Sequence, residues 1–168
     1  MPNKSWKAEE IDKHQVAIIH KLAHEIWPQT YSDLLSEGQI VYMLNMMYSI
    51  ESLENQIASG HKMYVFKYNE QETGFLVIEH NKDESNKTKV HKIYLQPKHQ
   101  GTGLGKIMMD FAAEKALESG DKSLFLNVNR QNSALGFYEH YGYKKMYSED
   151  NDIGEGYLME DYVMEKEL

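Results

Sequence analysis

The sequence contains no cysteine, and this absence removes a whole class of chemistry. Disulfides, thiol nucleophiles and cysteine-ligated metals are excluded, and a reducing compartment is compatible with the chain. No apolar run approaches the roughly 20 residues that a membrane helix needs, and the stretch from Met1 to Trp6 lacks the apolar core of a signal peptide. We therefore expect a cytoplasmic protein with no membrane partner.

Proline and positive charge are also scarce. With only three prolines, 41% hydrophobic and 26% charged residues, the 168-residue chain has the composition of one folded domain, and we predict a single domain over residues 1–168. The formal net charge is −8. This charge argues against a nucleic-acid partner, because affinity for nucleic acid comes mostly from neutralising phosphates. It tolerates a local phosphate site and would mildly attract cationic substrates.

Helical spacing of apolar residues dominates the first sixty positions. Proline and glycine then mark the ends of segments, and a serine can cap a helix at its start. The predicted elements are a helix from Glu9 to Ile26 closed by Pro28, a second from Glu37 to Tyr48, and a third from Ile50 with Ser49 as N-cap and Gly60 as its stop.

The period then changes to that of strands, with two further helices between them. The mixed order predicts an α+β fold in which helices flank one largely antiparallel sheet. The predicted elements are strands at 63–68 and 74–80 joined by a turn at 69–72, a strand at 89–95, a helix at 104–117, a strand at 123–128, a helix at 133–141, and a final hairpin of 143–147 and 157–164 around 149–154.

A glycine loop follows the strand that ends at Leu95. Glycines at every second position, Gly101, Gly103 and Gly105, let backbone N–H groups converge, and the helix that begins near Leu104 points its positive end at the same place. The loop therefore predicts an anion site. Its spacing fits neither the dinucleotide-binding pattern G-x-G-x-x-G nor the Walker pattern, because Gln100 stands where the first Walker glycine should be.

Two motifs identify a family. Gln100, Gly103 and Gly105 satisfy Gln/Arg-x-x-Gly-x-Gly/Ala, and the later stretch Asn132 to Tyr143 is close to N-x-x-A-x-x-F-Y-x-x-x-G-F/Y. On these motifs, in this order, the chain resembles the GNAT superfamily of acyl-CoA N-acyltransferases over nearly its whole length. The resemblance implies a GNAT-like fold and acetyl-CoA as acyl donor.

The resemblance also implies where acetyl-CoA binds. The pantetheine arm would pair with the strand before the glycine loop, the backbone N–H near Leu95 would bind the thioester oxygen, and the pyrophosphate would lie on the loop. Without a cysteine no acyl-enzyme is expected, so the amine would attack directly in a ternary complex. The implied donor-binding residues are Ile93, Tyr94, Leu95, Gln100, Gly101, Thr102, Gly103, Leu104, Gly105, Lys106, Asn127, Asn132, Phe137 and Tyr138.

The catalytic assignments are less complete. Tyr138 matches the tyrosine often proposed in the family to protonate the departing thiolate, although it could be an ordinary half-buried tyrosine. A base must take a proton from the acceptor ammonium. Glu79, His91 and Tyr94 are candidates, as is an ordered water, and the sequence does not choose among them. Phe137 is interpreted chiefly as core, and Asn132 either as an N-cap or as a cofactor contact.

The acceptor is the most open question. The aromatic- and methionine-rich segments Trp27–Tyr31 and Tyr42–Tyr48 are interpreted mostly as core, with faces that could line a pocket or a dimer contact, and we expect a homodimer. The same region resembles bacterial polyamine acetyltransferases of the PaiA type, which implies a small-molecule primary amine as acceptor.

Other classes stay open beside it: a protein or peptide N-acetyltransferase, a non-catalytic CoA-binding regulatory module, or a nucleotide-binding protein. No metal site is predicted, because the eight histidines are scattered and His24-Glu25 lacks a second histidine four residues after the first.

Overall fold

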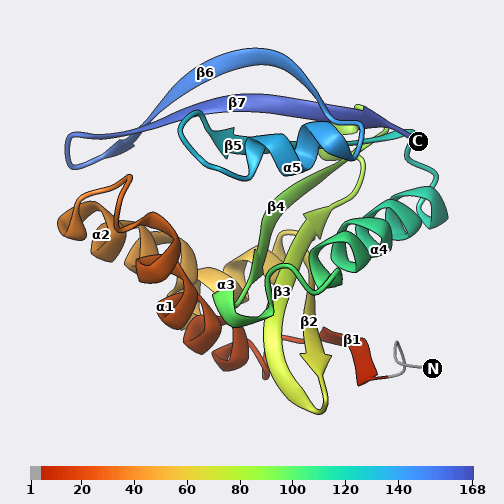
Figure 1. Ribbon diagram of the computed structural model, residues 1–168, viewed down its shortest axis with the longest axis horizontal. Coiled ribbons are helices and arrows are strands. Elements are labelled where there is room, and N and C mark those ends of the chain that lie inside the picture. Colours follow the sequence, from red (N-terminus) through yellow and green to blue (C-terminus); the bar gives the residue numbers. More distant parts are fainter. Residues whose placement is uncertain (1–4) are drawn as a thin grey trace. The chain divides into compact units, whose positions relative to one another are not determined.

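The computed structural model describes residues 5–168 (Figure 1). Met1 to Lys4, which begin the N-terminal stretch considered above, lie outside the described residues. The helices and strands are β1 (Trp6–Ile11), α1 (Ala17–Tyr31), α2 (Glu37–Tyr48), α3 (Ile50–Ala58), β2 (Lys62–Tyr68), β3 (Gln71–Glu79), η2 (Lys82–Glu84), β4 (Lys87–Leu95), η3 (Pro97–His99), α4 (Leu104–Glu118), β5 (Ser123–Asn129), α5 (Leu135–His140), β6 (Lys144–Gly154) and β7 (Tyr157–Glu167).

The strands form one seven-stranded sheet in the order β1-β2-β3-β4-β5-β7-β6. β4 and β5 run parallel, whereas β1 with β2, β2 with β3, β5 with β7 and β6 with β7 are antiparallel pairs. This confirms the predicted α+β class with a largely antiparallel sheet. Within the described part of the chain, no helix is both long and apolar enough to cross a membrane.

Two compact units can be distinguished in the chain. The first contains the residues up to Glu79 together with Lys92–Phe111, and the second contains His80–His91 and Ala112–Leu168. We call them unit 1 and unit 2 and describe each by itself. The single domain over residues 1–168 stays a prediction.

The first element of the described residues is a strand, which includes the start of the predicted helix. Trp6–Ile11 pairs with β2, Trp6 lying opposite Tyr68, and the Trp6 ring stacks on Phe66. This pairing with a distant strand overrides the local helical spacing of residues 9–11. The prediction was also wrong at the other end, because α1 continues through Pro28 to Tyr31. Pro28 is exposed, so the carbonyl that loses its N–H partner there can be hydrated.

The next two helices confirm the predicted boundaries. α2 spans Glu37–Tyr48, and the hydroxyl of Ser36 caps it by accepting a hydrogen bond from the Gln39 N–H. α3 begins at Ile50, and its N-cap is the predicted Ser49, whose hydroxyl accepts from the Ser52 N–H at 3.1 Å. Both caps satisfy N–H groups that a helix start leaves without partners.

Unit 1 has an aromatic core on the sheet. The turn between β2 and β3 is the two residues Asn69 and Glu70, both with positive φ, which suits a tight hairpin. On one side of these strands, Tyr64 and Phe66 pack edge-on against Phe111 of α4. These contacts fix α4 against β2 within unit 1.

Unit 2 ends in a longer hairpin than predicted. The expected loop at 149–154 belongs to β6, and the turn lies at Glu155 and Gly156, which have φ of 55° and 80°. β6 is the last strand of the sheet and almost fully exposed, and its residues from Ser148 to Asp152 are all polar. The prediction of a loop at these residues was wrong. An exposed edge strand need not alternate apolar and polar residues, so its sequence can look like that of a loop.

Candidate functional site

The glycine loop has the backbone shape that an anion cradle requires. Gly101 and Gly103 have φ of +81° and +86°, a region that side chains disfavour, and a Cβ at either position would meet no atom within 4 Å. The space where a side chain would stand is therefore open at both glycines. α4 starts directly afterwards at Leu104, so the loop and the helix start are consecutive. This local geometry fits the phosphate groups of a CoA donor.

The side chains of the loop mostly bind the loop itself. The hydroxyl of Thr102 donates to the His99 carbonyl, and the Gln100 amide lies 3.5 Å from the Leu95 carbonyl. Lys106 Nζ lies 2.7 Å from the carboxylate of Asp110, one turn along α4. The side chains of Thr102 and Gln100 thus bind backbone carbonyls of the loop and of the strand before it. The Asp110 carboxylate compensates part of the positive charge of Lys106.

The strand before the loop is packed closely against β3. The Gln96 N–H donates to the Thr73 carbonyl at 2.8 Å. A Cβ on Gly74 would lie 2.6 Å from the carbonyl oxygen of Tyr94. Gly74 therefore lets the two backbones approach where β4 carries Ile93, Tyr94 and Leu95. Sequence reasoning missed Gly74, because a glycine in a strand pattern does not say which backbone it faces.

Tyr94 joins an aromatic cluster that connects α1, α2 and the sheet. Its hydroxyl lies 2.8 Å from that of Tyr31, and Trp27 Nε1 donates to the Tyr48 hydroxyl at 3.1 Å. Tyr48 also packs edge-on against Phe75. Burial raises the pKa of Tyr48 well above its ordinary value of 10, so this phenol stays protonated. The Trp27–Tyr31 and Tyr42–Tyr48 segments thus supply core, as interpreted.

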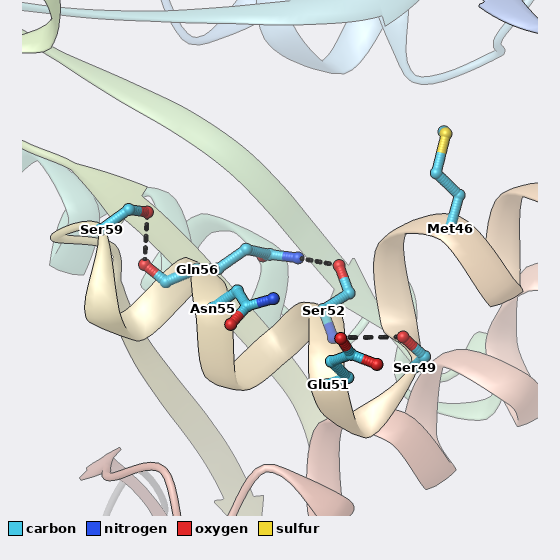
Figure 2. Close-up of a pocket in the computed structure, with 7 residues that line it drawn as sticks. All are labelled: Met46, Ser49, Glu51, Ser52, Asn55, Gln56 and Ser59. Atoms are coloured by element: carbon cyan, nitrogen blue, oxygen red, sulfur yellow. Dashed lines mark hydrogen bonds between the residues drawn. The ribbon is translucent and has the colours of Figure 1, made fainter.

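A polar hollow lies along α3 and the end of α2 (Figure 2). Its volume is about 540 Å³, and it is widely open to solvent rather than enclosed. Gln56 connects it to the sheet: its amide donates to Ser52 at 3.0 Å, and its Oε1 accepts from Lys92 Nζ of β4 at 2.8 Å. The lining residues are Met46, Ser49, Glu51, Ser52, Asn55, Gln56 and Ser59.

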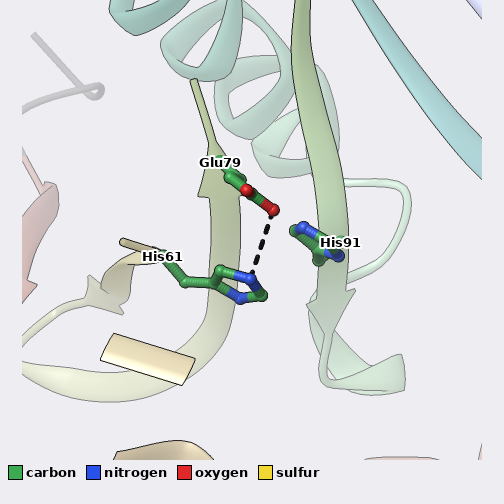
Figure 3. Close-up of side chains that lie close together, drawn as sticks. All are labelled: His61, Glu79 and His91. Carbon is green, nitrogen blue, oxygen red and sulfur yellow. Dashed lines mark ion pairs between the residues drawn. The ribbon is translucent and has the colours of Figure 1, made fainter. Parts of the chain in front are cut away.

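Glu79, a candidate base, is paired with a histidine. Figure 3 shows the His61 imidazole directed at the Glu79 carboxylate, with Nε2 3.3 Å from Oε1. The side chains are 14% and 23% exposed, respectively. Sequence reasoning did not single out His61. His61 directly precedes β2 and Glu79 ends β3, and a single sequence does not show that these two positions are neighbours. His91, another candidate base, is half-buried on β4 and belongs to unit 2.

The second motif forms the turn into α5 in unit 2. Asn132 Oδ1 accepts from the Ala134 N–H at 2.8 Å, which forms a turn just before the helix. The N-cap of α5 is Ala134, which has no side-chain cap, so the interpretation of Asn132 as the N-cap was wrong. Tyr138 is buried, at 9% exposed, and its ring contacts Phe137 and Tyr143 edge-on. Phe137 is 36% exposed, so its interpretation as core was wrong; a six-residue helix buries only one face.

Asn127 lies between two carboxylates. Its amide donates to Glu149 at 2.7 Å and to Asp161 at 3.3 Å. Burial, and then the Glu149 charge, raise the pKa of Asp161, whereas hydrogen bonds from Asn151 and Asn127 lower the pKa of Glu149. Asn127 was predicted to contact the donor. In the structure its side-chain amide is already hydrogen-bonded to residues of β6 and β7.

The predicted site residues fall into both units. Unit 1 contains Glu79 and the stretches 93–95 and 100–106, which bring the end of β4 directly to the glycine loop. Unit 2 contains Asn127, Asn132, Phe137 and Tyr138. The glycine loop of unit 1 has the local structure expected of it, whereas the second motif in unit 2 departs from expectation at Asn132 and Phe137. Their assignment to donor binding and catalysis stays a prediction.

Comparisons with known proteins agree with this geometry. A spermidine N(1)-acetyltransferase of Thermoplasma acidophilum is 29% identical over 146 residues, which cover 83% of this chain and 86% of that protein. The crystal structure of PaiA N-acetyltransferase from Thermoplasma acidophilum, in complex with coenzyme A, superposes with a TM-score of 0.81 at 25% identity, covering 98% of this chain and 99% of the other. A GCN5-related N-acetyltransferase from Rhodopseudomonas palustris shares the fold, with a TM-score of 0.80 at 17% identity over 96% of this chain and 95% of that one.

The family model of the acetyltransferase (GNAT) domain matches residues 31–166. This range includes both motifs, the glycine loop and the turn into α5. The chain therefore belongs to the GNAT family of acetyltransferases and is an acyl-CoA-dependent N-acetyltransferase.

Proposed function

We propose that this enzyme transfers the acetyl group of acetyl-CoA to a primary amine of a small, polyamine-like molecule. The observation that carries the proposal is the similarity to a spermidine N(1)-acetyltransferase, which extends over 83% of this chain and 86% of that protein. The polar hollow with Glu51 in its lining suits a cationic acceptor. The net charge of −8 also favours a cation over an anion.

In this proposal the end of β4 and the glycine loop bind the donor. The N–H groups of Gly101 to Leu104 and the start of α4 would receive the pyrophosphate. The Leu95 N–H would stabilise the negative charge that develops on the thioester oxygen as the amine attacks. Asn127, Asn132 and Phe137 of unit 2 complete the proposed donor-binding set.

Proton transfers accompany acyl transfer at both the nitrogen and the sulfur. The acceptor ammonium first loses a proton to a base, for which we propose Glu79, with Tyr94 as the alternative. The amine then attacks the thioester carbon, the C–N bond forms as the C–S bond breaks, and Tyr138 protonates the departing thiolate. The acylated nitrogen loses its second proton to solvent, and the Tyr138 phenolate regains a proton from solvent, so one proton is released per turnover. The chain has no cysteine, so the acetyl group passes directly to the amine in a ternary complex.

An amine-panel assay of free CoA release tests the function. Purified protein with acetyl-CoA would be offered spermidine, aminosugars, amino acids and peptides with free N-termini. We expect the highest kcat/KM with spermidine-like amines. Turnover only with peptides would replace the proposal by a protein N-acetyltransferase. Acetyl-CoA binding by calorimetry without turnover of any amine would indicate a non-catalytic CoA-binding module.

The role of Tyr138 can be tested by removing only its hydroxyl. Tyr138→Phe should lower kcat by roughly 10²-fold or more, the usual effect of losing a general acid, with acetyl-CoA affinity nearly unchanged. Tyr141→Phe, in the next turn of the same chain segment, is the matched control and should leave kcat at the wild-type value. Unchanged turnover of Tyr138→Phe across the pH range would remove Tyr138 from the mechanism.

We also propose that the protein acts as a cytoplasmic homodimer. Val41, Met46 and Ile50 are exposed on α2 and at the start of α3, where they could contact a second copy. Light scattering coupled to size exclusion should give twice the mass of the 19.6 kDa chain. A mass equal to one chain at assay concentration would contradict the dimer.

A further inference from the structure

The His61–Glu79 pair is fixed by the fold from two directions. α3 ends at Ala58, Gly60 has φ of +108°, and the His61 N–H then donates to the Gln56 carbonyl at 3.0 Å. On the other side, β2 begins with Lys62 opposite Ile78 of β3. One step back along β2 and one forward along β3 place His61 opposite Glu79. The helix end and the strand register therefore both position the imidazole against the carboxylate.

The pair is also more shielded than an ordinary surface ion pair. Its two side chains are 14% and 23% exposed, whereas those of the Lys7–Glu70 pair are 46% and 78% exposed. Exposed pairs contribute little, because water screens them and both side chains lose rotamer freedom. In the His61–Glu79 pair the His61 backbone is held by its hydrogen bond to Gln56, and the imidazole contacts one of the two carboxylate oxygens, Oε1.

Gln56 connects this pair to both parts of the proposed site in unit 1. Its carbonyl accepts the His61 N–H, its side chain lines the polar hollow, and its Oε1 accepts from Lys92 Nζ. Lys92 directly precedes Ile93, the first residue proposed to bind the donor. Gln56 therefore links the His61 backbone both to the hollow proposed for the acceptor and to the strand proposed for the donor.

We propose that His61 is a positioning residue for Glu79, holding its carboxylate in the orientation in which it takes a proton from the acceptor ammonium. The inference rests on the proposed function. One proton moves from the ammonium to the Glu79 carboxylate, and the imidazole N–H stabilises that carboxylate while it is still ionised. The neutral amine then attacks the thioester. After transfer, the proton returns to solvent, and the pair is ready for the next acceptor.

A double-mutant cycle with spermidine tests this role. Glu79→Gln should lower kcat/KM by roughly 10²-fold or more, the usual range for a general base. His61→Leu, which cannot donate a hydrogen bond, should lower it by roughly 10-fold or more. His61→Gln retains an N–H donor and should recover most of the activity. His61→Leu should cause no further loss when Glu79 is already Gln.

Controls separate positioning from folding and from the proposed function. Lys7→Gln removes an exposed ion pair of the same unit and should leave kcat/KM and the pH profile unchanged. Acetyl-CoA affinity, measured by calorimetry, should be equal in the wild type and in all His61 and Glu79 variants. If the wild-type protein acetylates no amine, the proposed function fails; if it does and the cycle is additive, only the positioning role fails.

Two outcomes overturn the inference directly. One is a His61→Leu variant that loses thermal stability but keeps the wild-type kcat/KM, because a merely structural pair would behave in this way. The other is that Glu79→Gln keeps full activity while His91→Gln is inactive. This result would identify His91, rather than Glu79, as the general base.

Discussion

At the scale of single residues, Gly74 is the most constrained position near the proposed donor site. A methyl group there would lie 2.6 Å from the Tyr94 carbonyl oxygen, which belongs to backbone and cannot rotate away. We predict that Gly74→Ala lowers the free energy of unfolding by about 1–3 kcal/mol, the usual cost of overpacking. It should also weaken acetyl-CoA binding, because the end of β4 must shift. Urea unfolding and calorimetry measure the two effects.

Gly136→Ala is the control for this substitution. Its Cβ would meet no atom within 4 Å, and it lies within α5, where alanine is favoured over glycine. Stability should stay equal or rise slightly. Equal stability of the Gly74→Ala and Gly136→Ala variants would show that β3 and β4 adjust without cost.

Asp161 gives a prediction about pH. Burial raises the pKa of Asp161 above its ordinary value of 3.8. In the pH range just above that value, the Asp161 carboxyl therefore holds its proton more tightly in the folded chain than in the unfolded chain. The free energy of unfolding therefore falls as pH rises through this range. Asp161→Asn cannot ionise, so it should gain stability relative to wild type between acidic and neutral pH. Thermal midpoints at both pH values measure the difference.

The exposed Asp33 provides the comparison for that experiment. Asp33→Asn should follow the wild-type stability at both pH values. If Asp161→Asn instead became less stable than wild type on raising the pH, the ionised Asp161 carboxylate would be a net stabilising group, through the Asn127 amide and the Arg130 charge.

At the scale of elements, α3 depends on one side chain at its start. Removal of the Ser49 hydroxyl leaves the Ser52 N–H without its cap, which typically costs about 1 kcal/mol. Ser49→Ala should therefore lower the thermal midpoint and raise the KM for the amine, because Ser49 and α3 line the polar hollow. Ser36→Ala removes the equivalent cap of α2 and should lower the midpoint only. An equal change of KM in both variants would show that the polar hollow does not bind the acceptor.

The sequence predicted elements with a strong local signal and failed where distant contacts decide. Ser49 and Gly60 set the limits of α3 correctly, because caps and stops are local chemistry. β1 was missed because its strand conformation depends on β2, some fifty residues later. In the candidate site, the glycine loop and Asn132 were visible as motifs. Gly74 and His61 were not, since their partners Tyr94 and Glu79 are assigned only by strand register.

At the scale of the whole molecule, net charge should influence substrate capture. A chain with a net charge of −8 attracts a polycation through solvent, and this attraction is screened as the Debye length falls from about 10 Å at 0.1 M salt to about 3 Å at 1 M. We predict that the KM for spermidine rises with salt while kcat changes little. A primary amine of similar length whose tail carries no charge should show a smaller rise of KM with salt. Steady-state kinetics in a salt series tests this, and identical salt dependence for both amines would contradict it.

The division of the chain limits how this enzyme can be cut or recombined. The boundary between the units is crossed at Glu79, at His91 and again at Phe111, and the latter two crossings fall inside β4 and α4. No single cut therefore releases either unit as a continuous polypeptide. A chimaera made with one crossover point would combine part of a unit from one parent with the remainder from another. Exchange of a whole unit between relatives accordingly requires transplanting two segments together.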